Sequence, residues 1–138
     1  MTALTDRRIL VTGPAGQIAF PLVERLAADN EVWGIARFSS PASRERVESV
    51  GCTTRVVDLT EPDWSDLPDH FDHVLHLAIF QSPDPDYEQA IRVNCEGTAL
   101  LMARFSDARS FLDVSSIAVY DRNADPAHLY TELDPIGE

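Results

Sequence analysis

A glycine-containing turn near the start of the chain carries the clearest chemistry in this sequence. Gly13 and Gly16 follow the short apolar run 8–12, and Ala19 comes three residues later. Gly13 permits a tight turn, and Gly16 lets the backbone approach an anion closely. A helix that begins here offers free N–H groups and a partial positive charge to a pyrophosphate. The pattern predicts dinucleotide binding, although a purely structural turn also uses glycine. The predicted contacts are Gly13, Ala15, Gly16, Gln17 and Ile18.

The rest of the chain alternates short apolar runs with stretches of helical spacing. This alternation is typical of a parallel sheet with helices on both faces. Strands are expected at 8–12, 31–36, 54–57, 73–78 and 110–115, and helices at 17–28, 41–50 and 87–105. The predicted fold is a doubly wound α/β sheet of the Rossmann type with strand order 3-2-1-4-5. We expect a nucleotide-binding domain over residues 1–120 and a loop over 121–138.

The composition argues against several classes of partner. The formal net charge is −12, whereas nucleic acid and anionic membrane surfaces need a positive face. No stretch reaches the roughly 18 apolar residues of a membrane span. Cys52 and Cys95 form no C-x-x-C pair, so we expect reduced thiols and a cytoplasmic location. No metal site is expected, because strand alternation points His73 and His76 to opposite faces.

The end of the second expected strand bears on the choice between the two nicotinamide cofactors. An acid at this point hydrogen-bonds the ribose 2′-hydroxyl of NAD, whereas an arginine accommodates the 2′-phosphate of NADP. The sequence has Arg37, followed by Phe38, Ser39 and Ser40, and no acid. A guanidinium binds phosphate through two donors, and serine hydroxyls add further donors. NADP is therefore favoured over NAD; the alternative is that Arg37 is a solvated side chain.

Several longer motifs resemble the extended branch of the short-chain dehydrogenase/reductase superfamily. The turn reads T-G-P-A-G-Q-I from residue 12, and the fourth strand carries H-L-A from residue 76. The long helix carries V-N-C-E-G-T from residue 93, and S-S-I-A-V-Y begins at residue 115. The resemblance covers the whole chain. It implies the NAD(P)-binding portion of an oxidoreductase or epimerase/dehydratase acting on a sugar nucleotide or another small carbonyl compound.

The same resemblance implies further cofactor contacts. Asp58 would face the adenine amino group and Leu59 would line the adenine pocket, although aspartate also serves well as a turn cap. The small side chain of Ala78 would let the backbone pass close to the ribose and phosphates. His76 is expected to be packed and hydrogen-bonded at the strand end. The remaining contacts that the resemblance implies are Leu77, Asn94, whose family counterpart tethers the long helix to the fourth strand, and Val114.

Ser116 is the catalytic residue that the resemblance implies, since the family's serine hydrogen-bonds the reacting oxygen of the substrate. Proton transfer in the family depends on a Y-x-x-x-K motif, because a free phenol with a pKa near 10 needs a nearby cation. The sequence contains no lysine, and Asp134 stands four residues after Tyr130. We therefore expect the chain to stop before the catalytic helix and the later strands, and to be inactive by itself.

Two further expectations concern function and assembly. The alternative to an enzyme portion is a non-catalytic module that binds and senses NAD(P), although such a module does not need Ser116. The helices that would follow are expected to cover apolar surface beside the helix over 87–105. Exposed surface of this kind favours a homodimer, or a second polypeptide that completes the fold.

Overall fold

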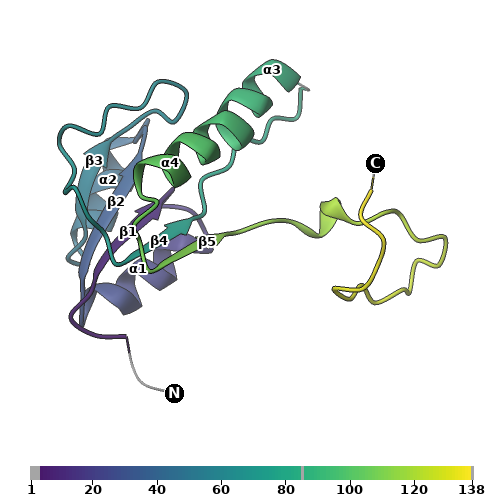
Figure 1. Cartoon of the computed structure of the whole chain (residues 1–138), viewed down its shortest axis with the longest axis horizontal. Coiled ribbons are helices and arrows are strands. Elements are labelled where there is room, and N and C mark those ends of the chain that lie inside the picture. The colour runs from purple at the N-terminus through teal and green to yellow at the C-terminus, as the bar shows by residue number, and fades with distance from the viewer. Residues whose placement is uncertain (1–3, 85, 138) are drawn as a thin grey trace.

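The centre of the fold is a five-stranded parallel sheet with the order β3-β2-β1-β4-β5 (Figure 1). The computed structural model describes residues 4–84 and 86–137, so Glu138, the last residue of the expected loop, lies outside it. The strands are β1 (Arg8–Thr12), β2 (Glu31–Ala36), β3 (Thr53–Val56), β4 (His73–His76) and β5 (Ser110–Asp113). The predicted strand order and α/β class are confirmed.

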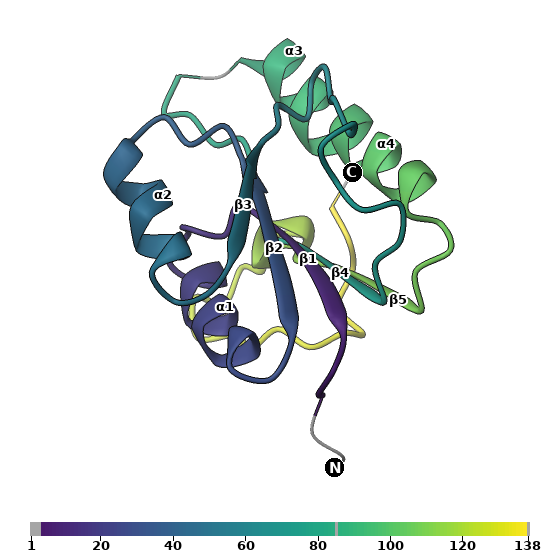
Figure 2. The same cartoon turned by 90° about the vertical axis from the view of Figure 1, so that its left-hand side faces the viewer.

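Helices cover both faces of this sheet, as the doubly wound arrangement requires (Figure 2). Helices α1 (Ala19–Ala27) and α2 (Pro41–Glu48) lie on one face. The other face carries a long helix made of α3 (Tyr87–Ala90), η1 (Ile91–Gly97) and α4 (Thr98–Arg104). Strand alternation divides the core accordingly: Ile9 and Val11 belong to one buried cluster, and Leu10 belongs to the other.

The long helix differs from the regular helix expected over 87–105. Residues Ile91–Gly97 form a π-helix, in which each hydrogen bond spans one residue more than in an α-helix. Within it, Gly97 is buried against Leu59, the residue that follows Asp58 after β3. The absence of a side chain at Gly97 therefore lets the helix approach the carboxyl end of the sheet.

Several other element boundaries differ from the expected ones by one or two residues: β3 begins one residue earlier, at Thr53, whereas α1, α2, β4 and β5 are shorter than expected. Helix α1 begins at Ala19 rather than Gln17, because residues 17–18 still belong to the turn. Helix α2 ends at Glu48, and Gly51 follows with a φ of 91°, a conformation that glycine adopts at little cost. Strands β4 and β5 both end at the registered pair His76 and Asp113, so each is two residues shorter than expected. None of the helices within 4–84 and 86–137 is long and apolar enough to cross a membrane.

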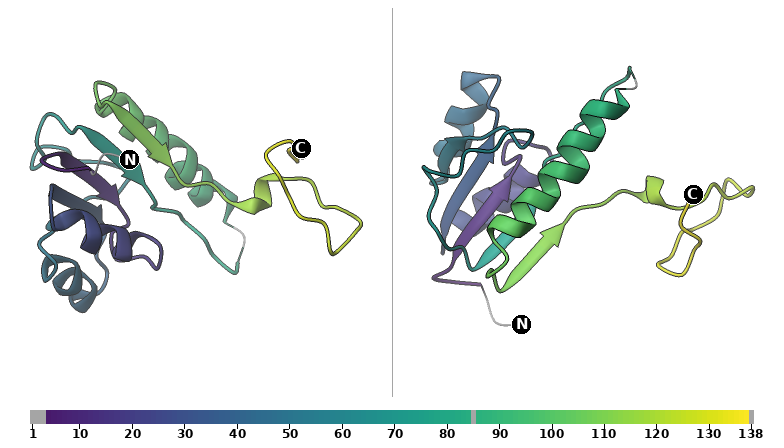
Figure 3. Two further views of the ribbon diagram at one scale, coloured as in Figure 1. Left: turned by 90° about the horizontal axis from the view of Figure 1, so that it is seen from below. Right: turned by 45° about the horizontal axis from the view of Figure 1, so that its top comes forward.

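Residues 114–137 extend away from the layered body (Figures 1 and 3). They contain the short 3₁₀ helix η2 (Ile117–Val119) and an isolated antiparallel bridge between Tyr120 and Ile136. The bridge closes an irregular loop, and the rings of Tyr120 and Tyr130 stack inside it with their centroids 5.6 Å apart.

Candidate functional site

A cavity of about 350 Å³ opens at the carboxyl ends of the strands. It lies where the strand order reverses between β1 and β4, the position at which doubly wound sheets bind ligands. Eight of the predicted cofactor residues line it: Gly13, Ala15, Gly16, Arg37, Asp58, Leu59, Leu77 and Ala78. The cavity therefore joins the ends of β1, β2, β3 and β4 into one site.

The glycine turn forms the wall at the end of β1. Gly13 has a φ of 64°, and a β-carbon there would lie 3.1 Å from the Cα of Ala78. The N–H of Gly16 donates to the carbonyl of Gly13 over 3.0 Å, which closes the turn. Any side chain at Gly13 would be strained and would also intrude between β1 and the segment after β4. The turn thus has the bare backbone that a pyrophosphate needs for close approach.

The start of α1 is open toward an anion. Its N-cap, Ile18, makes no side-chain capping bond, and the first turn contains no acid. Gln17 and Ile18 are exposed and lie outside the cavity lining. The helix dipole at this end is therefore not neutralised by a carboxylate of its own first turn, and it favours a phosphate group.

The end of β2 and the first turn of α2 together place a cation and two hydroxyls at the cavity. Arg37, Ser39 and Ser43 all line it, and no described residue forms a hydrogen bond or ion pair with the guanidinium of Arg37. Phe38 lies between them with a φ of 45°, which is a strained conformation for a bulky residue. Among the described residues that line the cavity, Arg37 is the only arginine.

Asp58 combines the turn-cap role with a position in the cavity wall. Its Oδ1 accepts the backbone N–H of Thr60 at 2.9 Å and the Thr60 hydroxyl at 2.8 Å. The backbone hydrogen bond from Thr60 is the main reason why the pKa of Asp58 lies below its usual range, and the charges of Arg37 and Arg92 act in the same direction. An ionised carboxylate at this point is a hydrogen-bond acceptor only.

Besides Gln17 and Ile18, three further predicted residues lie outside the cavity lining. Asn94 uses its side-chain amide on Phe80: Oδ1 accepts the N–H at 2.7 Å and Nδ2 donates to the carbonyl at 3.0 Å. Val114 donates its N–H to the carbonyl of His76 over 3.0 Å. Ser116 is exposed, and its Oγ accepts the N–H of Ala118 at 3.2 Å as the N-cap of η2. The structure thus brings eight of the predicted dinucleotide contacts together at the cavity and leaves Ser116 on the extended segment (Figure 1).

The cavity also includes residues that were not predicted as cofactor contacts. Phe38, Ser43, Ile79, Phe80 and Val93 line it as well. Residues 79 and 80 simply continue the chain after the H-L-A motif, so their position follows once β4 ends at the cavity. Val93 precedes Asn94 in the π-helix, whose changed period could not be read from the sequence.

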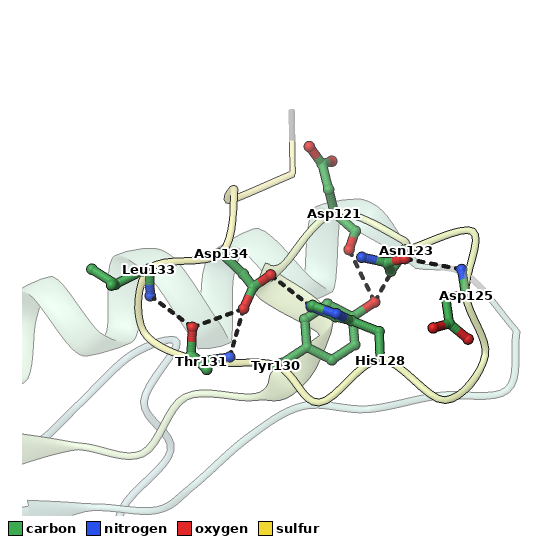
Figure 4. Close-up of polar contacts among 8 residues, drawn as sticks. All are labelled: Asp121, Asn123, Asp125, His128, Tyr130, Thr131, Leu133 and Asp134. Carbon is green, nitrogen blue, oxygen red and sulfur yellow. Dashed lines mark hydrogen bonds and ion pairs between the residues drawn. The ribbon is translucent and has the colours of Figure 1, made fainter.

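Tyr130 is fully engaged inside the extended loop (Figure 4). Its phenol donates to the carbonyl of Asp121 over 3.1 Å and accepts the N–H of Asn123 at 3.0 Å. Close to its ring, His128 Nε2 lies 2.7 Å from Oδ1 of Asp134. The phenol therefore holds the loop backbone and has no lysine beside it. Within the described part of the chain, no group of three or more His, Cys, Asp or Glu side chains is placed to hold a metal ion.

The parallel sheet and the glycine-lined cavity define a Rossmann-type nucleotide-binding domain. A sequence profile of the NAD dependent epimerase/dehydratase family matches residues 9–138. The chain belongs to this family, which confirms the resemblance to the extended short-chain dehydrogenases/reductases.

Individual relatives are consistent with this assignment. The chain is 34% identical over 92 residues to L-arabinose 1-dehydrogenase (NAD(P)(+)) of Haloferax volcanii, covering 66% of the chain and 33% of that protein. It resembles UDP-N-acetylglucosamine 4-epimerase of Methanobrevibacter ruminantium with a TM-score of 0.80 and 25% identity, over 96% of the chain and 44% of that structure. It also resembles UDP-glucuronic acid 4-epimerase of Bacillus cereus in complex with NAD, with a TM-score of 0.71 and 25% identity, over 93% and 47%. The chain thus spans between a third and a half of the length of these relatives.

Proposed function

We propose that this chain is the nicotinamide-dinucleotide-binding portion of an oxidoreductase or epimerase/dehydratase that acts on a sugar nucleotide or another small carbonyl compound. The observation that carries the proposal is the cavity beside Gly13, where a β-carbon would meet Ala78 and where α1 begins without an acid. Backbone of this kind binds a pyrophosphate. In this assignment residues 1–120 are the nucleotide-binding domain and 121–138 are a loop that leads toward the position of the family's catalytic helix.

NADP is the proposed cofactor in preference to NAD. Arg37 lines the cavity as an exposed guanidinium, with Ser39 and Ser43 in the same wall, and none of these side chains repels a 2′-phosphate. Asp58 and Leu59 would hold the adenine ring, with the ionised carboxylate accepting from its amino group. The bound cofactor would exchange a hydride with the substrate, and this chain's residues would orient it.

Ser116 would hydrogen-bond the reacting oxygen of the substrate. It lies exposed after β5, and its Oγ keeps donor capacity beyond the N–H it accepts from Ala118. The 138 residues contain no lysine that would lower the pKa of a tyrosine, so we propose that this piece alone is inactive. The same absence favours the second candidate, a non-catalytic NAD(P)-binding or sensing module. The free thiols Cys52 and Cys95 fit a cytoplasmic location.

A comparison of NADP and NAD binding tests the cofactor assignment. Arg37→Ala should weaken NADP binding by about ten- to a hundredfold, because a hydrogen bond to a charged group contributes about 1.5–3 kcal/mol. NAD binding should remain unchanged. Arg109→Ala is the control, since Arg109 lies at the opposite end of the strands, just before β5. Equal losses for both dinucleotides, or none for NADP, would contradict the NADP assignment.

A further inference from the structure

A continuous chain of hydrogen bonds runs beneath the β4 wall of the cavity, centred on His76. His76 and Thr12 are both buried, with 2% and 0% of their surfaces exposed. The Oγ1 of Thr12 accepts the N–H groups of Leu77 at 3.1 Å and of Ala78 at 2.9 Å. Both residues line the cavity. Thr12 therefore holds the backbone against which a dinucleotide would lie.

These bonds fix the direction of the next one. A hydroxyl has two lone pairs and one hydrogen, and the two N–H groups use both lone pairs of Thr12. Its hydrogen therefore points to His76 Nδ1, which lies 2.7 Å away. Nδ1 must accept this bond and carries no proton.

The other ring nitrogen is fixed in the same way. The hydroxyl of Thr98 donates to the carbonyl of Asn94 over 2.8 Å, so its oxygen accepts the proton of His76 Nε2 at 2.8 Å. The ring is thus a neutral imidazole with its proton on Nε2. The side chain of Asn94 then holds both backbone groups of Phe80, so the chain of bonds reaches both ends of the cavity-lining segment 77–80.

We propose that His76 is a positioning residue, which holds residues 77–80 in the geometry for dinucleotide binding only while its imidazole is neutral. A second proton on Nδ1 would face the hydroxyl hydrogen of Thr12, whose oxygen already accepts two N–H groups. Among the described residues, the buried hydroxyl of Thr12 has no other acceptor for its hydrogen. Its hydrogen bonds to the N–H groups of Leu77 and Ala78 must therefore break. The ligand in this inference is the dinucleotide of the proposed function.

The charges around the ring favour the neutral form. Burial lowers the pKa of His76, and the negative charge of Asp113 on β5, its partner in register, opposes this effect without overcoming it. Strand β1 and helix α4 contribute only the neutral hydroxyls of Thr12 and Thr98 at the ring. We therefore expect residues 77–80 to lose these hydrogen bonds at a pH below the ordinary histidine pKa of about 6.5.

The first test uses the chain without ligand. Nitrogen-15 NMR at pH 7.5 should show the His76 proton on Nε2, with Nδ1 unprotonated. Amide exchange of Leu77 and Ala78, corrected for intrinsic rates, should accelerate as the pH falls from 7 to 5. A proton on Nδ1 at pH 7.5, or protection of both amides that does not change with pH, would overturn the inference.

The second test measures the dissociation constant of NAD between pH 7.5 and pH 5.5. NAD is the probe because the 2′-phosphate of NADP itself titrates near pH 6. Wild-type affinity should fall by up to about tenfold per pH unit below the His76 pKa, as expected for one linked proton. His76→Asn keeps an acceptor for Thr12 without a titratable ring, so its affinity should not depend on pH. His73→Asn, at the half-buried start of the same strand, should behave as wild type.

The two tests distinguish the role of His76 from the proposed function. A pH dependence that persists in His76→Asn would overturn the inference. Absence of NAD and NADP binding at every pH would contradict the proposed function instead, while the ligand-free NMR result still decides the role of His76. The same NMR result on the wild-type chain decides the matter if His76→Asn does not fold.

Discussion

Gly97 in the π-helical segment lies directly against Leu59, and a β-carbon on residue 97 would come within 2.9 Å of the Leu59 Cβ and 3.0 Å of its carbonyl oxygen. Leu59 lines the cavity that we assign to a dinucleotide, so this contact connects the long helix with the proposed adenine pocket. Because one of the contacting atoms is the backbone oxygen of Leu59, a rotation of the Leu59 side chain alone would not make room for a β-carbon at residue 97.

Gly97→Ala should therefore lower stability although alanine favours helices. Overpacking in a core costs about 1–3 kcal/mol, and the helix propensity of alanine returns about 1 kcal/mol. A net loss of up to about 2 kcal/mol in urea unfolding is expected. Glu96→Ala at the exposed neighbouring position should change stability by less than about 0.5 kcal/mol. A Gly97→Ala variant more stable than wild type would show that the contact does not restrict the helix.

Stability should fall as the pH drops from about 6.5, in part through His76. Burial lowers the pKa of this histidine in the folded chain, so below pH 6.5 the unfolded chain binds more protons at this site than the folded chain. Stability then rises with pH across this window and is lost on acidification. Urea midpoints measured from pH 7.5 to 5 should show a shallower slope in His76→Asn than in wild type. An identical slope in both would contradict the assignment.

Self-association is expected from the apolar side chains that the long helix and β5 expose. Ile91 is 54% exposed, Met102 is 50% exposed and Leu112 is 50% exposed. Exposed apolar surface of this kind favours a homodimer or a second polypeptide that completes the fold. Light scattering should give a mass above 15.3 kDa, and Ile91→Glu should reduce it. The control is Leu129→Glu on the extended loop; a monomeric wild-type chain would contradict the expectation.

The extended loop should depend on the hydroxyl of Tyr130. Tyr130→Phe removes the hydrogen bonds to Asp121 and Asn123 and keeps the ring stacked on Tyr120. Amide exchange at Asn123 should become faster, while dinucleotide affinity stays the same because the loop does not line the cavity. Tyr87→Phe, at a 78% exposed ring, should change neither. Reduced dinucleotide affinity in Tyr130→Phe would show that the loop takes part in the site.

The sheet could be predicted because each strand is a short apolar run bounded by turn residues, and the alternation with helices restricts the topology. The role of Gly13 could also be predicted, since a glycine directly after the first strand is typical of a tight turn that approaches a ligand. The prediction of eight cavity residues rests on this arrangement, because the carboxyl ends of parallel strands meet at one edge.

Other features have no local signal in the sequence. The π-helix depends on tertiary contacts, among them Gly97 against Leu59 and Asn94 against Phe80. The left-handed backbone at Phe38 opposes the preference of an aromatic residue, so only the surrounding structure imposes it. The ring proton of His76 follows from two hydrogen-bonding partners, Thr12 and Thr98, that are distant from it in sequence.

Dinucleotide titration of two glycine variants tests the central claim most directly. Gly13 and Gly51 both have positive φ, so alanine at either position should cost about 1–2 kcal/mol of stability. Only the β-carbon at residue 13 would enter the cavity, 3.1 Å from Ala78, whereas at Gly51 the nearest contact is Ala27 at 3.9 Å. We predict saturable NADP binding by wild type and Gly51→Ala, and at least about tenfold weaker binding by Gly13→Ala, equivalent to 1.4 kcal/mol. Equal binding by both variants, or no saturable binding by wild type, would contradict the assignment of this cavity to a nicotinamide dinucleotide.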